Sequence, residues 1–256
     1  MKTLVSGIRT IARGIGIDVV RYRDSAQILP HDVDAGAALI WHAVRDYTMT
    51  SALRVLTLLD AVRYIVQSDI RGDIVECGVW RGGSMMAAAM QLTSLGKTDR
   101  DLYLFDTFEG MPPPTQHDID PHGTAAHEIF GPNGRSAGSQ GLPWKAASVE
   151  EVRAGLMKSG YPQDRFKLIK GRTENTVPAA APGSIALLRL DTDWYESTRH
   201  EMLHLFPRIA SGGVLLIDDY GYWKGSRKAV DEYIKEHKLQ ILLCRVDDSA
   251  RIAIVR

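Results

Sequence analysis

Two apolar runs in the second half of the chain each end in a pair of acids. The run in "LLRLDTDWYEST" stops at Asp191 and Asp193, and the run in "GGVLLIDDYGYW" stops at Asp218 and Asp219. Both runs resemble parallel strands buried on both faces, so we expect their acids to meet at one edge of a sheet. Neighbouring carboxylates resist ionising together, and a divalent cation removes that conflict. Ligands that offer only oxygen favour a hard cation, so we predict Mg²⁺ held by Asp191, Asp218 and Asp219.

A simpler interpretation of these acids stays open, namely solvated carboxylates that cap the helices following the strands. Asp193 is either such a cap or a partner of the metal ligands. The histidines form no metal-ligand pattern, although His200 and His204 have the i, i+4 spacing of a metal pair. No third ligand accompanies that pair, and we favour packing or surface roles for both.

Glycines surround the end of an earlier strand-like run. "VECGVWRGGS" places Gly78 after the run and Gly82 and Gly83 before a helix-prone segment, which lets backbone approach a ligand closely. The spacing differs from the G-x-G-x-x-G dinucleotide fingerprint, and the lysine of a phosphate loop is missing. Asp106, at the end of the next run, is placed to bind a ribose diol. These features favour a nucleoside without pyrophosphate, such as S-adenosylmethionine; alternatively, the glycines serve a tight turn and Asp106 caps a helix.

The elements that must position these residues alternate along the chain. Strands are predicted in "GDIVECGVW" and at 101–106, 165–171, 184–191 and 212–219, and helices at 51–67, from Ser84, and at 149–160, 197–210 and 226–237. Two last strands, 239–244 and 251–256, are joined too briefly for a crossover helix. We therefore predict an α/β, doubly wound, Rossmann-like fold with a mostly parallel seven-stranded sheet and a C-terminal antiparallel hairpin.

Two segments interrupt this alternation. Residues 109–144 are rich in Pro, Gly and His, and an insertion of this length predicts a lid beside the site, with His117, His122 and His127 as candidates to contact substrate. Residues 1–45 predict an N-terminal arm and helix that contacts the acceptor or a second subunit. The remainder, 46–256, forms the main domain.

Composition narrows the class of partner. The 256 residues carry a formal net charge of zero, which disfavours nucleic acid as a partner. No apolar run has the roughly 18–20 residues that span a bilayer. Cys77 and Cys244 lie in apolar runs without metal-ligand spacing, and we expect two buried thiols in a reducing, cytoplasmic setting.

Four motifs together resemble a known family. "GDIVECGVWRGGS", "LYLFDTFEGMPPP", "LRLDTDWYEST" and "GGVLLIDDYGYWKGSRKAVDEY" are similar to the metal-dependent sugar O-methyltransferases of the macrocin and mycinamicin type, from about residue 45 to the end of the chain. The resemblance implies a class I methyltransferase fold, S-adenosylmethionine as donor, Mg²⁺ on the three acids named above, and Asp191 as the base. The donor-binding residues that it implies are Met49, Glu76, Cys77, Gly78, Gly83, Ser84, Asp106, Thr107, Phe108, Gly171 and Asp191.

The resemblance has two departures. Thr192 and Trp194 stand where the family pattern has Gly and Leu, beside the expected metal, where they would reshape the acceptor pocket. The first forty or so residues match poorly, so a macrolide acceptor is not implied.

We therefore predict an S-adenosylmethionine- and Mg²⁺-dependent O-methyltransferase that acts on a sugar hydroxyl of a natural-product glycoside or glycan and assembles as a homo-oligomer, a dimer. Positioning and charge stabilisation would supply most of the catalysis. The alternatives are a catechol-type O-methyltransferase acting on an aromatic diol, a Mg²⁺-dependent hydrolase, and a non-catalytic nucleotide-binding protein. The glycine loop disfavours the hydrolase, and the carboxylate cluster disfavours the binding protein.

Overall fold

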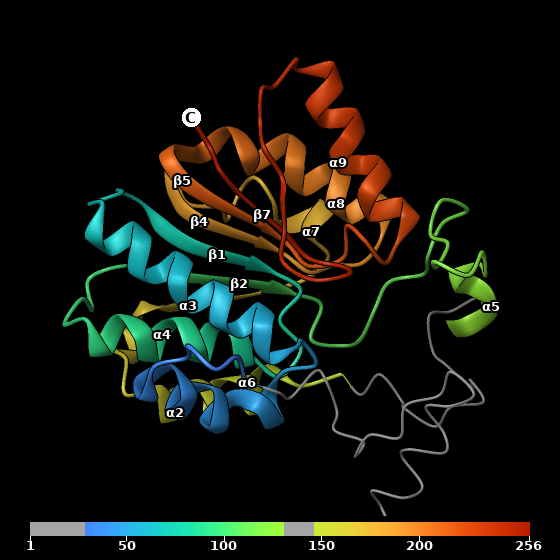
Figure 1. The fold of residues 1–256 in the computed structure, drawn as a ribbon. Coiled ribbons are helices and arrows are strands. Elements are labelled where there is room, and N and C mark those ends of the chain that lie inside the picture. Colours follow the sequence, from blue (N-terminus) through green and yellow to red (C-terminus); the bar gives the residue numbers. More distant parts are fainter. Residues whose placement is uncertain (1–28, 131–145) are drawn as a thin grey trace, which may run out of the picture.

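The structure, a computed structural model, describes residues 29–130 and 146–256. This part of the chain is built around a seven-stranded sheet (Figure 1). Its strand order is β3-β2-β1-β4-β5-β7-β6. The strands are β1 (Asp73–Cys77), β2 (Leu102–Asp106), β3 (Phe166–Lys170), β4 (Ile185–Leu190), β5 (Ile209–Ile217), β6 (Cys244–Arg245) and β7 (Arg251–Ile254). Strands β1 to β5 are parallel, β7 runs antiparallel to β5, and β6 runs antiparallel to β7. The predicted fold class is confirmed.

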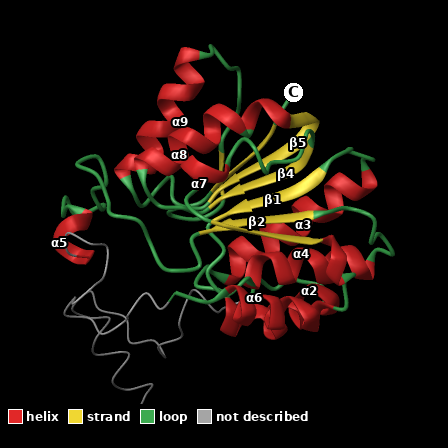
Figure 2. Ribbon diagram, turned by 180° about the vertical axis from the view of Figure 1, so that it is seen from behind, coloured by secondary structure: helices red, strands yellow, loops and turns green. Residues whose placement is uncertain are grey.

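Helices cover both faces of the sheet (Figures 1 and 2). One layer contains α2 (Ala35–Val44), α3 (Ala52–Gln67), α4 (Gly83–Ser94) and α6 (Val149–Leu156), and the other contains α7 (Thr173–Thr176), α8 (Tyr195–His204) and α9 (Lys224–Glu236). Successive strand residues face opposite layers. Leu187 packs into the core beneath α3 and α4, and Leu188 into the core beneath α8 and α9, each with no exposed surface.

Several predicted boundaries are corrected by local chemistry. The helix expected over 197–210 ends at His204, and a short 3-10 turn, Phe206–Arg208, leads into β5. Pro207 in that turn has no N–H to continue the helical ladder. Residues 239–243 are not strand, because β6 contains only Cys244 and Arg245 and pairs with β7 at the sheet edge.

The expectation of two buried thiols is half right. Cys77 is buried in β1, as predicted, whereas Cys244 is exposed on the two-residue edge strand. An edge strand has a neighbour on one side only, so an apolar run there does not guarantee burial.

The first part of the predicted lid, 109–130, is attached to the body of the domain. Asp118 is fully buried, accepts two hydrogen bonds from Thr115, and accepts a third, of 2.8 Å, from the Tyr195 N–H at the start of α8. The Trp194 indole also donates to the Pro112 carbonyl at 2.9 Å. Helix α5 (Ala126–Phe130) stands at the outer end of this segment (Figure 1).

The remaining insertion residues, 131–145, and residues 1–28 of the arm lie outside the described residues. The lid and the arm therefore stay predictions. Within the described ranges, no helix is both long and apolar enough to cross a bilayer.

Candidate active site

The carboxyl ends of the parallel strands open into a cavity of about 230 Å³. It lies where the strand order reverses between β1 and β4, the position at which doubly wound sheets bind ligands. Most of the residues predicted for the site line it, namely Met49, Gly78, Ser84, Asp106, Thr107, Gly171, Asp191, Asp218 and Asp219. Residues from both the donor set and the acid set thus share one cavity.

The other members of the predicted donor set lie behind the cavity wall. Glu76 and Cys77 are buried within β1, and Phe108 packs into the core. Gly83, the first residue of α4, lies close to the turn that precedes α3. An added Cβ would lie 2.6 Å from the Tyr47 carbonyl oxygen in that turn. Direct contact of these four residues with a donor stays a prediction.

Gly78 permits close approach of two strand ends. Its φ is +84°, and an added Cβ would lie 1.9 Å from the carbonyl oxygen of Asp191. The Asp191 N–H donates to the Cys77 carbonyl at 2.8 Å, which joins β4 to β1 at the same level. A side chain at position 78 would therefore push the acid set away from the donor set.

Asp106 holds the loop that follows Gly78. One carboxylate oxygen accepts the N–H groups of Val79 at 2.7 Å and Trp80 at 3.0 Å, and the other accepts the Phe108 N–H at 2.7 Å. Val79 and Trp80 precede α4, so Asp106 organises the loop rather than capping the helix. Trp80 has a φ of +47°, a strained conformation of the kind that functional loops retain.

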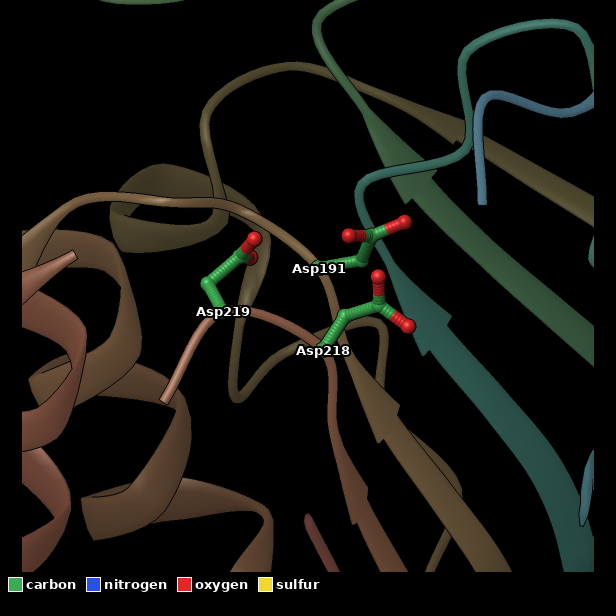
Figure 3. A group of neighbouring side chains, drawn as sticks. All are labelled: Asp191, Asp218 and Asp219. Atoms are coloured by element: carbon green, nitrogen blue, oxygen red, sulfur yellow. The ribbon is translucent and has the colours of Figure 1, made fainter. Parts of the chain in front are cut away.

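The three acids gather beyond the ends of β4 and β5 (Figure 3). One oxygen from each of Asp191, Asp218 and Asp219 lies within 4.8 Å of the others. This is the grouping that the sequence predicted. All three ligands are carboxylates, the donor type that hard divalent cations prefer.

A buried arginine joins this cluster from within β4. Arg189 Nη1 donates to Glu76 Oε1 at 2.8 Å and to Asp191 Oδ2 at 2.7 Å, and its Nη2 donates to Asp218 Oδ1 at 2.7 Å. The Arg189 side chain is 4% exposed. A charge buried this deeply must be paired, and here one guanidinium is shared by three carboxylates.

A second arginine reaches the cluster from α3. Arg54 Nη1 donates to Asp218 Oδ2 at 2.5 Å, and its Nε donates to Asp247 Oδ2 at 2.7 Å. Asp247 lies in the turn between β6 and β7, so Arg54 ties α3 to the C-terminal hairpin. Asp218 thereby has an arginine on each of its oxygens.

The acids consequently differ in how readily they ionise. Burial disfavours ionisation of Asp218, but the charges of Arg189 and Arg54 outweigh it and lower its pKa. Burial raises the pKa of Asp191 well above its usual range against the opposing charge of Arg189. Burial, reinforced by repulsion from Asp193, does the same to the pKa of Asp219. Asp191 and Asp219 are therefore the acids that a cation would help most to ionise.

Asp193 supports Asp219 rather than capping a helix. Its N–H donates to Asp219 Oδ2 at 3.1 Å, and its side chain accepts the Trp223 indole N–H at 2.8 Å. Burial, with repulsion from Asp191, raises the pKa of Asp193 to about 8. Of the two sequence interpretations, the structure favours a partner of the metal ligands.

Glu201 lies beneath the cavity wall with no exposed surface. Its Oε2 accepts the Thr192 hydroxyl at 3.0 Å, while its Oε1 and the Thr173 hydroxyl are buried without hydrogen-bond partners among the described residues. Burial raises the pKa of Glu201 to about 8. A protonated Glu201 can donate a hydrogen bond as well as accept one, which suits its position between two threonines.

His200 and His204 take the packing roles expected from the sequence. The rings of His200 and His204 lie 4.4 Å apart, but His200 Nε2 is engaged with the Val177 carbonyl at 2.9 Å. The rings of His117 and Tyr195 have centroids 4.6 Å apart and planes tilted by 59°. Contact of His117, His122 and His127 with substrate stays a prediction. In the part of the chain that the structure describes, the three-acid group is the one set of potential metal ligands.

Sequence reasoning missed the two arginines and Glu201. Arg189 did leave a signal, because a lone charge inside the buried strand "IALLRL" must find acids to pair with. Arg54 and Glu201 left no comparable signal, since charged residues are ordinary on the polar face of a helix.

The sheet order, with an antiparallel β7 inserted between β5 and β6, and a ligand cavity at the switch point define a class I methyltransferase. The chain belongs to the Macrocin-O-methyltransferase (TylF) family, whose sequence model matches residues 41–252. It is an S-adenosylmethionine-dependent O-methyltransferase. The recognition made from four motifs is confirmed.

Individual relatives agree with this assignment. The chain is 32% identical to 8-demethyl-8-(2,3-dimethoxy-alpha-L-rhamnosyl)-tetracenomycin-C 4'-O-methyltransferase of Streptomyces olivaceus, over 92% of this chain and 90% of that one. It is 29% identical to mycinamicin III 3''-O-methyltransferase of Micromonospora griseorubida, over 78% and 75% of the two chains. The solved structure of the O-methyltransferase NovP matches with a TM-score of 0.70 and 27% identity, over 82% of each chain.

Proposed function

We propose that this chain transfers the methyl group of S-adenosylmethionine to a sugar hydroxyl of a glycoside, with Mg²⁺ held by Asp191, Asp218 and Asp219. The observation that carries the proposal is the acid group beside the Gly78 loop in a single cavity. Support for a sugar acceptor comes from the relative in Streptomyces olivaceus, whose name specifies methylation of a rhamnosyl-tetracenomycin. Support for the donor comes from Gly78 and Asp106, which line the cavity at the ends of β1 and β2.

The acid set, Asp191, Asp218 and Asp219, fits a hard divalent cation. Its three ligands are carboxylates, and burial, with repulsion from neighbouring acids, raises the pKa values of Asp191 and Asp219 although two arginines lie nearby. When bound, the cation would keep these carboxylates ionised and lower the pKa of the acceptor hydroxyl.

The hydrogen bonds of Asp191 support a role for it as the base. Arg189 holds its Oδ2, while Oδ1 accepts no hydrogen bond from the described residues. Oδ1 is therefore free to take the proton of the acceptor hydroxyl as methyl transfer proceeds. Arg189, buried and fixed by three acids, sets the orientation of the Asp191 carboxylate.

A catechol-type acceptor is the competing proposal within the class. Incubation with S-adenosylmethionine and Mg²⁺, followed by mass spectrometry, should show methylation of members of a panel of methyl glycosides and none of catechol. The reaction should stop in EDTA and return with excess Mg²⁺. Methylation of catechol alone, or full activity in EDTA, would overturn the proposal.

Three further predictions belong with this proposal: a homodimer, a cytoplasmic location, and a lid formed by 109–144. Because 109–130 is already held by Trp194 and Tyr195, closure over bound ligands is expected of the rest of that segment. Light scattering tests the first. Limited proteolysis with and without S-adenosylhomocysteine tests the third, because ligands should protect a segment that closes over them.

A further inference from the structure

A second cavity, of about 280 Å³, adjoins the active-site cavity. The two share wall residues Pro112, Arg172, Glu174 and Ser197, so an acceptor whose hydroxyl lies near Asp191 can extend from one into the other. The residues that line the second cavity alone are Pro113, Thr115, Asn175, Trp194 and Glu196.

The outer wall of this second cavity is fixed before any ligand binds. Asp118 accepts hydrogen bonds from the Thr115 N–H at 2.6 Å and hydroxyl at 2.9 Å, and it is itself held by the start of α8. Pro112 is held by the Trp194 indole at 2.9 Å. A preformed wall lowers the entropy lost when a ligand binds.

The inner wall presents polar side chains, three of them exposed and that of Glu174 half-buried. Arg172, Glu174 and Asn175 come from the start of α7, and Glu196 comes from the first turn of α8. Among the described residues, none of these four side chains has a hydrogen-bond or salt-bridge partner. They offer donors and acceptors together, the combination that hydroxyl groups match.

The surrounding charge and shape exclude other classes of occupant. Two glutamates against one arginine, beside the three acids of the first cavity, disfavour an anionic group such as a nucleotide diphosphate. The aromatic rings nearby do not offer open faces to an apolar aglycone, since Trp194 and Trp223 pack against each other with 2% and 4% of their surfaces exposed. The exposed Pro113 ring offers an apolar surface that the C–H face of a sugar can contact.

From these observations we infer that the second cavity binds a neutral, hydroxyl-rich unit attached to the methylated sugar, that is, a second sugar residue. This inference rests on the proposed function. It places methylation after a glycosyl transfer, because the acceptor is then an assembled disaccharide or glycan rather than a nucleotide-activated sugar.

The test begins with the methyl glycoside that the enzyme methylates best. That sugar is then presented in three extended forms: linked to a second neutral sugar, as an octyl glycoside, and as its nucleotide diphosphate. We expect the disaccharide to have the lowest KM of the four, by about 10-fold against the methyl glycoside if one or two hydrogen bonds are gained. A lower KM for the octyl or the nucleotide form would overturn the inference.

Variants of residues in the second cavity test whether this cavity causes the preference for the disaccharide. Asn175→Ala and Glu196→Ala should each raise the ratio of the disaccharide KM to the methyl glycoside KM by about 5–10-fold, with S-adenosylhomocysteine affinity unchanged. Glu236→Ala, on the exposed end of α9 and outside both cavities, is the matched control. An unchanged ratio in both cavity variants would refute the assignment. Failure to methylate any glycoside would instead refute the proposed function, so the two failures are distinguishable.

Discussion

At the ends of β1 and β2 the cavity wall is fixed by main-chain contacts, whereas at the ends of β4 and β5 it is fixed by charged side chains. On the donor side, Gly78 lies against the Asp191 carbonyl, and Asp106 collects backbone N–H groups. On the acid side, Arg189 and Arg54 balance part of the charge of Asp218 and its neighbours.

The two sides should therefore fail in different ways. The donor side depends on shape, so donor affinity should fall when side-chain atoms are added there and should change little with pH. The acid side depends on a balance of buried charges, so it should respond to protonation, to metal, and to the loss of one partner. The variants below test this contrast, from the largest expected effect to the smallest.

Asp191→Asn should cause the largest loss. The asparagine can still accept the Arg189 hydrogen bond, so the fold should persist, but it cannot take the acceptor proton. Turnover should fall by ~10²–10⁴-fold at saturating Mg²⁺, the usual contribution of a general base, while calorimetry should show unchanged S-adenosylhomocysteine binding.

Asp219→Asn is the matched control for that experiment. It removes a carboxylate from the same group without removing the proposed base, so excess Mg²⁺ should restore part of the rate. Near-normal turnover of Asp191→Asn at saturating Mg²⁺ would show that Asp191 is not the base.

Gly78→Ala should produce the largest effect on the donor side. The added Cβ meets main chain at 1.9 Å, which no side-chain rearrangement relieves, and the φ of +84° adds strain. We expect S-adenosylhomocysteine affinity to fall by ~100-fold or more, with about 3 kcal/mol of stability lost to strain and displacement together.

Gly160→Ala separates strain from displacement. Gly160 also has a positive φ, +72°, but an added Cβ would meet nothing within 4 Å. It should cost ~1 kcal/mol of stability and leave donor affinity unchanged. Equal effects of the two alanines on donor affinity would contradict a role for close approach at Gly78.

The raised pKa of Glu201 predicts how the stability of the fold depends on pH. Burial raises its pKa from 4.5 in the unfolded chain to about 8 in the fold, so the folded state holds the proton more tightly. The resulting stability is fully present below pH 4.5 and is lost as the pH rises towards 8, by at most a few kcal/mol. Urea unfolding of Glu201→Gln should show a weaker decline across this window, so that the variant gains on the native chain at pH 8.5.

Glu236→Gln, an exposed change of the same type, should unfold like the native chain throughout that pH range. A native pH profile in Glu201→Gln would mean that Glu201 is ionised in the fold.

The contrast between the two sides also explains what could be predicted from the sequence. Strand ends, the parallel sheet and the meeting of Asp191 with Asp218 follow from hydrophobic runs and from the topology they impose. The pairing of Arg54 with Asp218 did not follow, because the two residues are 164 positions apart and no local pattern links them. Cys244 was misplaced for a related reason: an apolar run shows that a segment can be buried, but which strand becomes the sheet edge depends on the whole topology.

Asp106 is a charged side chain on the donor side, which otherwise depends on shape. Asp106→Ala should weaken S-adenosylhomocysteine binding by ~1.5–3 kcal/mol, or roughly 10–150-fold, through loss of a charge-assisted hydrogen bond. Two causes would give the same number: a lost contact with the ribose, or a loop released when the Val79 and Trp80 N–H groups lose their acceptor.

A double-mutant cycle with a donor product that lacks the ribose hydroxyls separates these two causes. If Asp106 binds the ribose, the Ala variant should lose little or no further affinity for the deoxygenated ligand, because the hydrogen bond is already absent. If Asp106 acts through the loop, the penalty should be the same for both ligands, since the loop is released in each case. Calorimetry on the native chain and the variant with both ligands gives the coupling energy. A coupling near zero would make Asp106 a purely structural residue, and it would leave the donor side dependent on shape alone.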